Sequence, residues 1–357
     1  MTRTFLRPTA FVDSPFGFEG QVARLAGGLN WFSAVELIHW DGARRTASQL
    51  IAVSEIEARL DESTVAQWQA ITAARIPLQL GERTIRLDQP QVMGIVNATP
   101  DSFSDGGRFA NASDAAAAGA DMAAQGAAII DVGGESTRPG ARTVWAGDEI
   151  ERVIPIIQKL SASGSAVSID TRKAEVMQAA VATGARLIND VSGLTYDENA
   201  LATAASLGVP VVLMHHQGSP ETMQQDPRYS DVLIEVYLWL EERVAAAVAA
   251  GIPREKILID PGFGFGKNVG HNLEIMNGLA MLHGLGCPIV LGASRKRTVG
   301  ALANEAPADR RLGGSIAFAL KAVEQGAQIV RVHDVPETIQ ALKIWRGLRD
   351  QALTPRP

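Results

Sequence analysis

The sequence lacks several features that would assign it to common classes of protein. It has a single cysteine among its 357 residues, Cys287, so no disulfide can form within the chain. Its apolar stretches are all far shorter than the ~20 residues of a membrane-spanning helix. Charges and prolines interrupt the N-terminal segment, where a signal peptide needs a continuous apolar core. We therefore expect a cytoplasmic protein that has no membrane partner.

Clusters of basic residues are lacking too. The formal net charge is −6 and the sequence pI is near 5.6. No run of Lys and Arg forms the basic stripe that is typical of nucleic-acid-binding proteins, so we expect no nucleic-acid partner. The composition, 46% hydrophobic and 20% charged, is ordinary for a globular protein. The length accommodates one large domain and one small domain.

A regular alternation of short β-rich runs and longer helical runs begins near residue 85. The predicted helices include residues 113–127, 148–160, 172–185 and 309–327. The eight predicted strands span residues 92–97, 128–133, 166–170, 186–190, 210–215, 257–262, 288–294 and 328–334. Eight such units in about 270 residues favour a (β/α)₈ TIM barrel over residues 85–357. A doubly wound open sheet is the alternative, since alternation alone does not distinguish the two folds.

A weak internal repeat supports this assignment. At three places, residues 125–131, 183–189 and 325–331, a Gly-Ala pair is followed by an apolar run that ends in a polar residue. Gly is the preferred residue just after a helix, so each repeat predicts a helix end, a tight turn and a buried strand.

The first 84 residues have a different composition. They contain three of the six Trp residues and half of the Phe residues, enough for a small core. Apolar and polar residues alternate on both sides of Asp41-Gly42, which predicts a β-hairpin. Residues 63–77 predict a capped amphipathic helix that ends before Pro77. We expect residues 1–84 to form a small N-terminal α+β appendage of unknown function.

Polar residues follow the predicted barrel strands at one end. Their side chains hydrogen-bond, ionise or bind anions, and they are Asn97, Asp131, Glu135, Asp170, Asn189, Asp190, His215, Asp260, Ser294, Lys296, Arg331 and His333. A polar residue at the end of one strand is common, but polar residues at the carboxyl ends of all eight strands predict an active site. Carboxylates accept hydrogen bonds from the N–H donors of an amino-pyrimidinone ring, whereas Arg and His donate hydrogen bonds to an oxyanion. The site is therefore predicted to bind a heterocycle at one side and an anion at the other.

Several familiar motifs are absent. Residues 262–267 resemble a phosphate loop, but Pro261 and Asn268 stand where that motif needs Gly and Ser or Thr. Lys267 occupies the last Gly position of a dinucleotide fingerprint. The pair His215-His216 lacks the spacing of a zinc site. Phe265 either packs within its loop or stacks on a substrate.

Eight sequence blocks together resemble the dihydropteroate synthase family, the pterin-binding barrel enzymes of folate synthesis. In chain order, these blocks are MGIVNATPDSFSDGG, DVGGESTRPGA, SIDTRKAEV, INDVSG, LMHHQG, DPGFGFGK, GASRKR and RVHDV. The resemblance runs from about residue 92 to 335. It implies that the pyrophosphate ester of 6-hydroxymethyl-7,8-dihydropterin reacts with p-aminobenzoate, giving 7,8-dihydropteroate and pyrophosphate. It also implies a Mg²⁺ requirement and a homodimer.

The resemblance assigns roles to individual residues. The pterin would be held by Asp170, Asn189 and Asp260, with Lys296 between the pterin and the p-aminobenzoate pocket. Asn97 would bind Mg²⁺, and the pyrophosphate would contact Arg138, Arg331 and His333. The remaining residues implied by the resemblance are Phe103 and Asp105 in a first loop, Thr137 and Pro139 in a second loop, and Arg297 at the p-aminobenzoate carboxylate. Asp105, Lys296, Arg331 and His333 are the predicted catalytic residues.

The chain also departs from the family pattern at a few positions. His216 stands where Met is common, and Arg297 stands where some members have Ser, so its backbone N–H, its guanidinium or both hold the carboxylate. Two alternatives share the pterin contacts: a corrinoid-linked methyltransferase and a non-catalytic pterin-binding relative. The loop blocks together with Arg331 and His333 favour the synthase, because a methyltransferase needs no pyrophosphate site.

Overall fold

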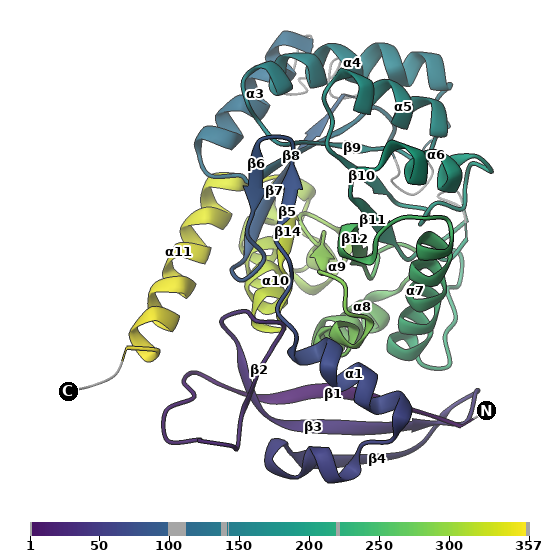
Figure 1. Cartoon of the computed structure of the whole chain (residues 1–357). Coiled ribbons are helices and arrows are strands. Elements are labelled where there is room, and N and C mark those ends of the chain that lie inside the picture. The colour runs from purple at the N-terminus through teal and green to yellow at the C-terminus, as the bar shows by residue number, and fades with distance from the viewer. Residues whose placement is uncertain (1, 99–111, 137–140, 142, 219–221, 355–357) are drawn as a thin grey trace.

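Eight parallel strands form a closed barrel in the computed structural model, which describes residues 2–98, 112–136, 141, 143–218 and 222–354 (Figure 1). The strands are β7 (Gln91–Asn97), β8 (Ile129–Gly133), β9 (Val167–Asp170), β10 (Leu187–Asp190), β11 (Val211–Met214), β12 (Ile257–Asp260), β13 (Val290–Leu291) and β14 (Ile329–Val332). Each pairs with its sequence neighbour, and β14 pairs with β7. A parallel bridge between Ile259 and Ile289 joins β12 to β13. The predicted (β/α)₈ barrel is confirmed, and the open sheet is wrong.

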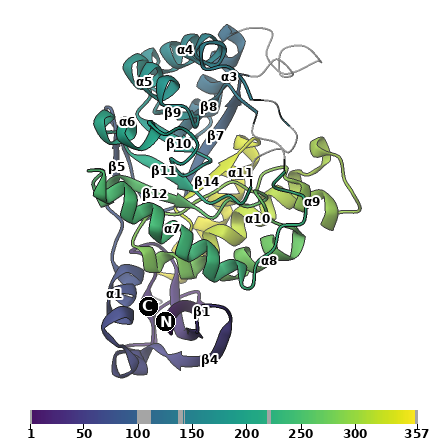
Figure 2. The same cartoon turned by 90° about the vertical axis from the view of Figure 1, so that its right-hand side faces the viewer.

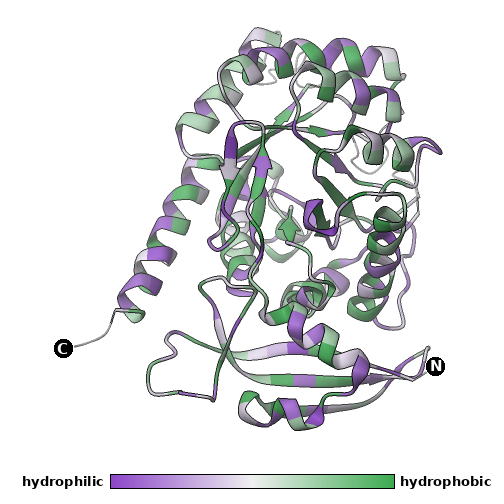
Figure 3. Cartoon of the chain, in the orientation of Figure 1, coloured by the Kyte–Doolittle hydropathy of each residue, from purple (hydrophilic) through white to green (hydrophobic). Residues whose placement is uncertain are grey.

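Helices cover the outside of this barrel. They are α3 (Ala112–Ala124), α4 (Ala146–Ala162), α5 (Ala174–Thr183), α6 (Ala200–Leu207), α7 (Val232–Ala249), α8 (Val269–Gly278), α9 (Arg297–Leu302), α10 (Leu312–Glu324) and α11 (Val335–Ala352). The helices together carry both hydrophilic and hydrophobic residues (Figure 3). In α4, Val153, Ile156, Ile157 and Leu160 are the buried apolar residues, one face of a 3.6-residue period.

The three Gly-Ala repeats share one backbone geometry. Gly126, Gly184 and Gly326 follow α3, α5 and α10 with φ values of 113°, 135° and 89°. The N–H of the next alanine then bonds the carbonyl five residues back, at 2.9 Å in each case. Such a bond closes a helix and directs the chain into the following strand. The repeat therefore encodes a helix stop, as predicted.

A short hairpin closes the N-terminal end of the barrel. It consists of β5 (Leu78–Leu80) and β6 (Arg83–Ile85), which pair antiparallel. Its apolar side chains pack against eight apolar residues, one for each barrel strand. Seven of them lie on a strand, and Ala166 directly precedes β9. They are Met93, Ile129, Ala166, Leu187, Val212, Leu258, Val290 and Ile329. The predicted boundary between residues 84 and 85 therefore falls inside β6, because these contacts place the hairpin with the barrel.

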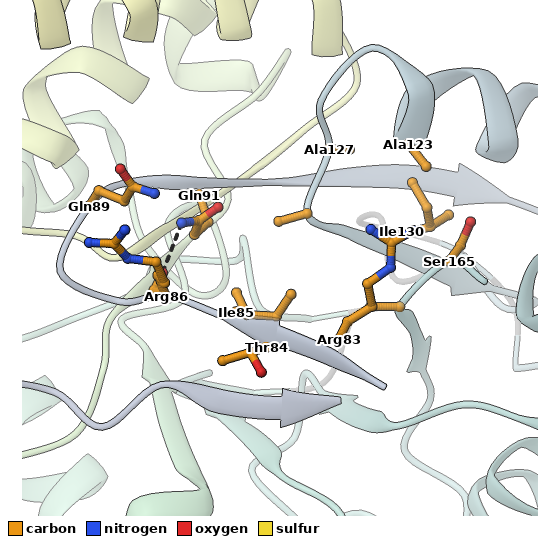
Figure 4. A pocket seen from close by; sticks show the side chains of 12 residues that line it. Arg83, Thr84, Ile85, Arg86, Gln89, Gln91, Ala123, Ala127, Ile130 and Ser165 are labelled. Carbon is orange, nitrogen blue, oxygen red and sulfur yellow. Dashed lines mark hydrogen bonds between the residues drawn. The ribbon is translucent and has the colours of Figure 1, made fainter. Parts of the chain in front are cut away.

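A hollow of about 250 Å³ lies beside this hairpin (Figure 4). The polar side chains that line it are already engaged. Arg83 Nε donates to Gly164 O at 2.9 Å, Arg86 pairs with Asp88, and Gln91 Nε2 donates to Arg86 O at 2.8 Å. The lining thus holds no convergent set of free polar groups, which a ligand site requires.

The N-terminal residues form an α+β unit, as the sequence predicts. Its sheet contains β1 (Arg3–Val12), β2 (Ala23–Arg24), β3 (Trp31–Trp40) and β4 (Arg45–Ala52), followed by a 3₁₀ helix η1 (Val53–Arg59) and α1 (Glu62–Thr72). The predicted hairpin at Asp41-Gly42 joins β3 to β4. The predicted helix over 63–77 ends earlier, at Thr72, because the Ile71 carbonyl accepts a bond from Ala26 N–H and Ala73 is extended.

The appendage packs on the side of the barrel near α7 and α8 (Figure 2). Phe5 meets Tyr237 of α7 edge-to-face, with ring centroids 5.2 Å apart. Arg3 pairs with Glu241 of α7, and Arg45 pairs with Asp231 at the N-terminus of the same helix. The side chain of Gln67 on α1 bonds the Leu6 N–H and the Thr4 carbonyl, which occupies polar groups on the outer edge of β1. None of the helices in the described segments has the length and apolarity to cross a bilayer.

Candidate functional site

The predicted site residues converge because inward-facing side chains alternate along each strand. An apolar layer of inward-facing residues contacts the hairpin. The inward positions two residues further along the strands include Asp131 on β8, Asn189 on β10, Asp260 on β12 and Arg331 on β14. The strand rise places this polar layer roughly 6.6 Å above the apolar one. The carboxyl ends of the strands therefore form a polar floor above a closed apolar base.

Arg331 connects the carboxylates of this floor. Its Nε donates to Asp131 Oδ2 at 2.6 Å, and its Nη2 donates to Asp170 Oδ2 at 2.7 Å. Asn189 Nδ2 donates to the same Asp131 oxygen at 3.0 Å. Arg331 was predicted at the anion side and Asp170 at the pterin side, so the structure joins the two predicted sides through one ion pair.

Burial changes the acidity of the carboxyl groups. It raises the pKa of Asp170 to about 7, with Arg331 opposing the shift and Asp131 adding to it. Burial also raises the pKa of Asp260, against the attraction of Lys296 and Arg331. A carboxyl group whose pKa lies near neutrality exchanges a proton at little cost, and such groups gather at functional sites.

Lys296 lies beside the loop that follows β12. Its Nζ donates to the Phe263 carbonyl and lies 4.5 Å from the centroid of the Phe265 ring. Burial lowers the pKa of this lysine to about 8, although Asp260 and Asp170 counteract the shift. The structure thus brings together Lys296, Phe265 and Asp260, three residues predicted for substrate binding.

Asn97, His333 and Arg297 lie at the ends of strands or just after them. Asn97 ends β7, and its side chain makes no hydrogen bond to the described residues. His333 follows β14, where its backbone N–H and Nδ1 lie 3.2 and 3.1 Å from Ser294 Oγ. Arg297 is exposed at the first position of α9. The three residues end or follow β7, β14 and β13, which are neighbouring strands of the barrel, so they lie on one side of the polar floor.

Five predicted site residues belong to two loops outside the described residues. They are Phe103, Asp105, Thr137, Arg138 and Pro139. The base of the second loop is described, however. Glu135 Oε1 accepts the Val144 N–H at 2.8 Å, and its Oε2 accepts Arg172 Nε at 3.0 Å. Lys173 Nζ lies 3.1 Å from Glu135 and 2.5 Å from the buried Glu149. This cluster joins the two ends of the segment 136–143.

Two residues of the site were not included among the predicted substrate contacts. Asp131 is fully buried and holds both Arg331 and Asn189. Lys267 was noted only because it breaks the dinucleotide fingerprint, yet it is 2% exposed and its Nζ donates to the Phe265 carbonyl. A lysine that ends a glycine-rich loop directly after a core strand is the sequence signal that could have identified it.

The described residues contain no group of three or more His, Cys, Asp or Glu side chains placed to hold a metal ion. Within the described segments, a metal at this site would therefore find few protein ligands. Mg²⁺ commonly binds in this way, through one or two protein oxygens together with substrate phosphates and water. The unpartnered amide oxygen of Asn97 fits that coordination chemistry.

Comparison with known proteins agrees with this geometry. The family model for the pterin binding enzymes matches residues 93–333. The dihydropteroate synthase of Escherichia coli K12 is 47% identical over 262 residues, which is 73% of this chain and 92% of that protein. The enzyme of Neisseria meningitidis serogroup B is 48% identical over 283 residues, covering 77% and 98%.

A solved structure extends the comparison to three dimensions. The dihydropteroate synthase of Xanthomonas albilineans in complex with 7,8-dihydropteroate superimposes with a TM-score of 0.70 at 44% identity, covering 78% of this chain and all of that one. Identity and coverage of this extent, together with the barrel and its polar floor, place the sequence in one family. The chain belongs to the dihydropteroate synthase family of pterin-binding enzymes.

Proposed function

We propose that this protein, a transferase of its family, joins the pyrophosphate ester of 6-hydroxymethyl-7,8-dihydropterin to p-aminobenzoate, releasing 7,8-dihydropteroate and pyrophosphate. The observation that carries the proposal is the convergence of Asp170, Asn189 and Asp260 at the carboxyl ends of three barrel strands. A relative from Xanthomonas albilineans has been solved with 4-aminobenzoic acid, and one from Yersinia pestis with a sulfonamide drug.

The pterin ring is bound by the polar floor. The carboxylates of Asp170 and Asp260 accept hydrogen bonds from the ring N–H and amino groups, and a carboxylate can accept two parallel donors. Asn189 offers both a donor and an acceptor to the ring carbonyl and nitrogen atoms. Because Asp131 holds Asn189 at 3.0 Å, the amide has a defined orientation before the substrate arrives.

The pyrophosphate lies on the side of Asn97, Arg138, Arg331 and His333. Arg331 uses Nε and Nη2 for Asp131 and Asp170, which leaves its Nη1 for a substrate oxygen. Mg²⁺ held by the Asn97 oxygen and the pyrophosphate would offset the negative charge that grows on the leaving group. Arg138 and His333 donate hydrogen bonds to the same anion.

The p-aminobenzoate lies beyond the pterin, next to Lys296, Phe265 and Arg297. The Phe265 ring offers an apolar face, and Arg297 binds the carboxylate at the N-terminus of α9. Phe103, Thr137 and Pro139 complete this pocket from the two loops. Relatives solved with p-aminobenzoate or a sulfonamide support a pocket of this kind.

The reaction is an alkylation of the aromatic amine. The bond between the pterin methylene carbon and the pyrophosphate oxygen breaks, and its electron pair leaves with pyrophosphate. The positive charge on the methylene is shared with the dihydropterin ring and is stabilised by the Asp105 carboxylate. The amine nitrogen then forms the new C–N bond and releases one proton to solvent. No nucleophilic side chain is needed, because the amine itself attacks.

We further propose a homodimer in the cytoplasm, with Mg²⁺ as the only cofactor. The resemblance to the family supports the dimer, and the single buried Cys287 supports a reducing compartment. Light scattering coupled to size-exclusion chromatography tests the dimer, which a monomeric mass at micromolar concentration would exclude. Removal of Mg²⁺ with a chelator tests the metal, and full activity in excess chelator would contradict this requirement.

The direct test of the proposed function follows pyrophosphate and dihydropteroate in parallel. Reactions contain dihydropterin pyrophosphate, p-aminobenzoate and Mg²⁺, and each component is omitted in turn. We expect dihydropteroate only in the complete mixture, with one pyrophosphate released per product. Tight pterin binding without turnover would instead identify a non-catalytic relative and contradict the proposal.

A further inference from the structure

The loop after β12, residues 261–267, is held by side chains from several elements. Each of five successive carbonyls, from residue 262 to residue 266, accepts a side-chain donor. The donors, in order, are Lys267, Lys296, Gln224, Lys267 and Tyr229. Glycines at 262, 264 and 266 adopt φ values of 68°, 83° and 63°, a left-handed conformation that favours glycine. The loop is thus a rigid carbonyl cradle rather than a phosphate-binding turn.

Lys267 lies at the centre of this cradle. Its Nζ lies 2.8 Å from His215 Nδ1 and 3.0 Å from the carbonyls of both Gly262 and Phe265. These three acceptors match the three N–H bonds of an ammonium group. Burial lowers the pKa of His215 well below its usual range, and so does the nearby Lys267, so the ring stays neutral and accepts at Nδ1. Burial lowers the pKa of Lys267 well below its usual range, and the attraction of Asp260 opposes this shift. The amino group is thus buried, fully hydrogen-bonded and electrostatically linked to Asp260.

The same loop controls two predicted substrate contacts. The carbonyl of Phe263 accepts Lys296 Nζ, and Asp260 Oδ1 accepts the Gly262 N–H at 2.7 Å. A Cβ at residue 262 would lie 1.7 Å from the His215 carbonyl, so this loop and the one after β11 are in backbone contact. Lys267 joins those two loops through His215 and the Gly262 carbonyl, and it interacts electrostatically with Asp260.

We infer that Lys267 is a positioning residue for the synthase reaction: it fixes the carbonyl cradle so that Asp260 and Lys296 meet the pterin, and it supplies the buried positive charge beneath Asp260. The inference rests on the proposed function. A lysine that served only to close the loop would influence stability alone. A lysine that also supports the Asp260 carboxylate must influence how pterin binding depends on pH.

The charge effect has a defined direction. Asp260 is influenced by burial, which raises its pKa, and by Lys296, Arg331 and Lys267, which lower it. The titratable and charged groups that face Lys267 are His215 and His216 after β11, Asp260 on β12, His271 on α8 and Lys296 after β13. Without the Lys267 charge, the Asp260 carboxyl group therefore holds its proton to a higher pH.

The test compares Lys267→Met and Lys267→Gln with the wild-type full chain. Initial rates of dihydropteroate formation are measured from pH 5.5 to 9, together with the unfolding temperature. We expect kcat/KM for dihydropterin pyrophosphate to fall more than tenfold in both variants, with a smaller change in kcat. The acid limb of its pH profile should move to higher pH.

Lys256→Met provides the matched control. Lys256 Nζ also bonds a backbone carbonyl, Gly208 O at 2.7 Å, but it lies at the opposite end of β12. The activity of Lys256→Met should stay within twofold of the wild type at every pH.

A second variant, Tyr229→Phe, removes one cradle contact, the 2.8 Å bond to Gly266 O, without removing charge. It should raise the KM for the pterin substrate without moving the acid limb.

Three outcomes overturn the inference. The first is a kcat/KM within twofold of the wild type in a folded Lys267 variant. The second is an equal loss at every pH, accompanied only by a lower unfolding temperature. The third outcome applies if neither Lys267 variant folds: it is an unchanged KM for the pterin substrate in Tyr229→Phe. An inactive wild type would instead contradict the proposed function, so the two failures are distinguishable.

Discussion

The two ends of the barrel are built from the same eight strands and have opposite chemistry. At the N-terminal end, Leu78, Leu80, Ile85 and Leu87 cover an apolar layer to which all eight strand positions contribute. At the C-terminal end, Asp131, Asn189, Asp260 and Arg331 replace that layer two residues further along. A side-chain period of two puts both layers on the inside of the barrel.

This difference shows how one scaffold separates stability from function. The side chains packed together at the apolar end are all uncharged, and their burial stabilises the barrel through the hydrophobic effect. The polar end contains acidic groups with raised pKa values and a lysine with a lowered one. Substitutions at the two ends should therefore change different measured quantities, which the following experiments test.

The largest expected effect is on ligand binding at the polar end. Asp260→Asn keeps the oxygen that accepts the Gly262 N–H at 2.7 Å but places an amide donor against a donor of the pterin. We expect the affinity for dihydropterin pyrophosphate to fall by about 3 to 4 kcal/mol, more than 100-fold. Isothermal titration measures this loss, and the unfolding temperature should change little. Unchanged affinity would remove Asp260 from the pterin contacts.

The next effect concerns stability at the apolar end. Leu80 is 2% exposed within the closing hairpin. Leu80→Ala should lower the free energy of unfolding by about 2 to 3 kcal/mol, because it removes buried methyl groups and leaves a cavity. Chemical denaturation measures this change, and kcat/KM below the transition should equal that of the wild type. Gln79→Ala, on the exposed side of the same strand, is the control and should be nearly neutral.

A third experiment uses pH to examine the polar end. The pKa of Lys296 lies near 8, so its ammonium is charged below that pH and neutral above it. We expect kcat/KM for the pterin substrate to fall about tenfold per pH unit above pH 8. Lys296→Arg stays charged throughout, so the residual activity of this variant should show no such decline. A wild-type profile that is flat to pH 9.5 would contradict a charged role for Lys296.

The smallest effect is expected on the outer surface of the hairpin end. Arg86 pairs with Asp88 at 2.5 Å, but their side chains are 61% and 42% exposed. Exposed ion pairs contribute little, so Arg86→Ala should leave the free energy of unfolding almost unchanged. Denaturation curves of the two proteins should overlap, and so should their activities. A loss near that of Leu80→Ala would show that polar contacts also close this end.

Sequence patterns predicted the barrel well because its elements are local. Each strand is a short apolar run, and each Gly-Ala pair ends a helix through bonds within one turn. Patterns did not predict the closing hairpin, since Leu78 and Ile85 become core residues only when all eight strands surround them. Nor did they predict the Arg331 ion pairs, which join β14 to β8 and β9 across 200 and 161 residues of sequence.

The sequence by itself determined the element order, the end of the barrel where polar residues gather and the family to which the blocks belong. The tertiary structure alone decided which charges meet: Arg331 with Asp131 and Asp170, and Lys267 with His215 beneath Asp260. Local propensity and periodicity act over a few residues, so a pattern in the sequence records them. The energy of a buried charge depends on every neighbour around it, and those neighbours come together only when the barrel closes.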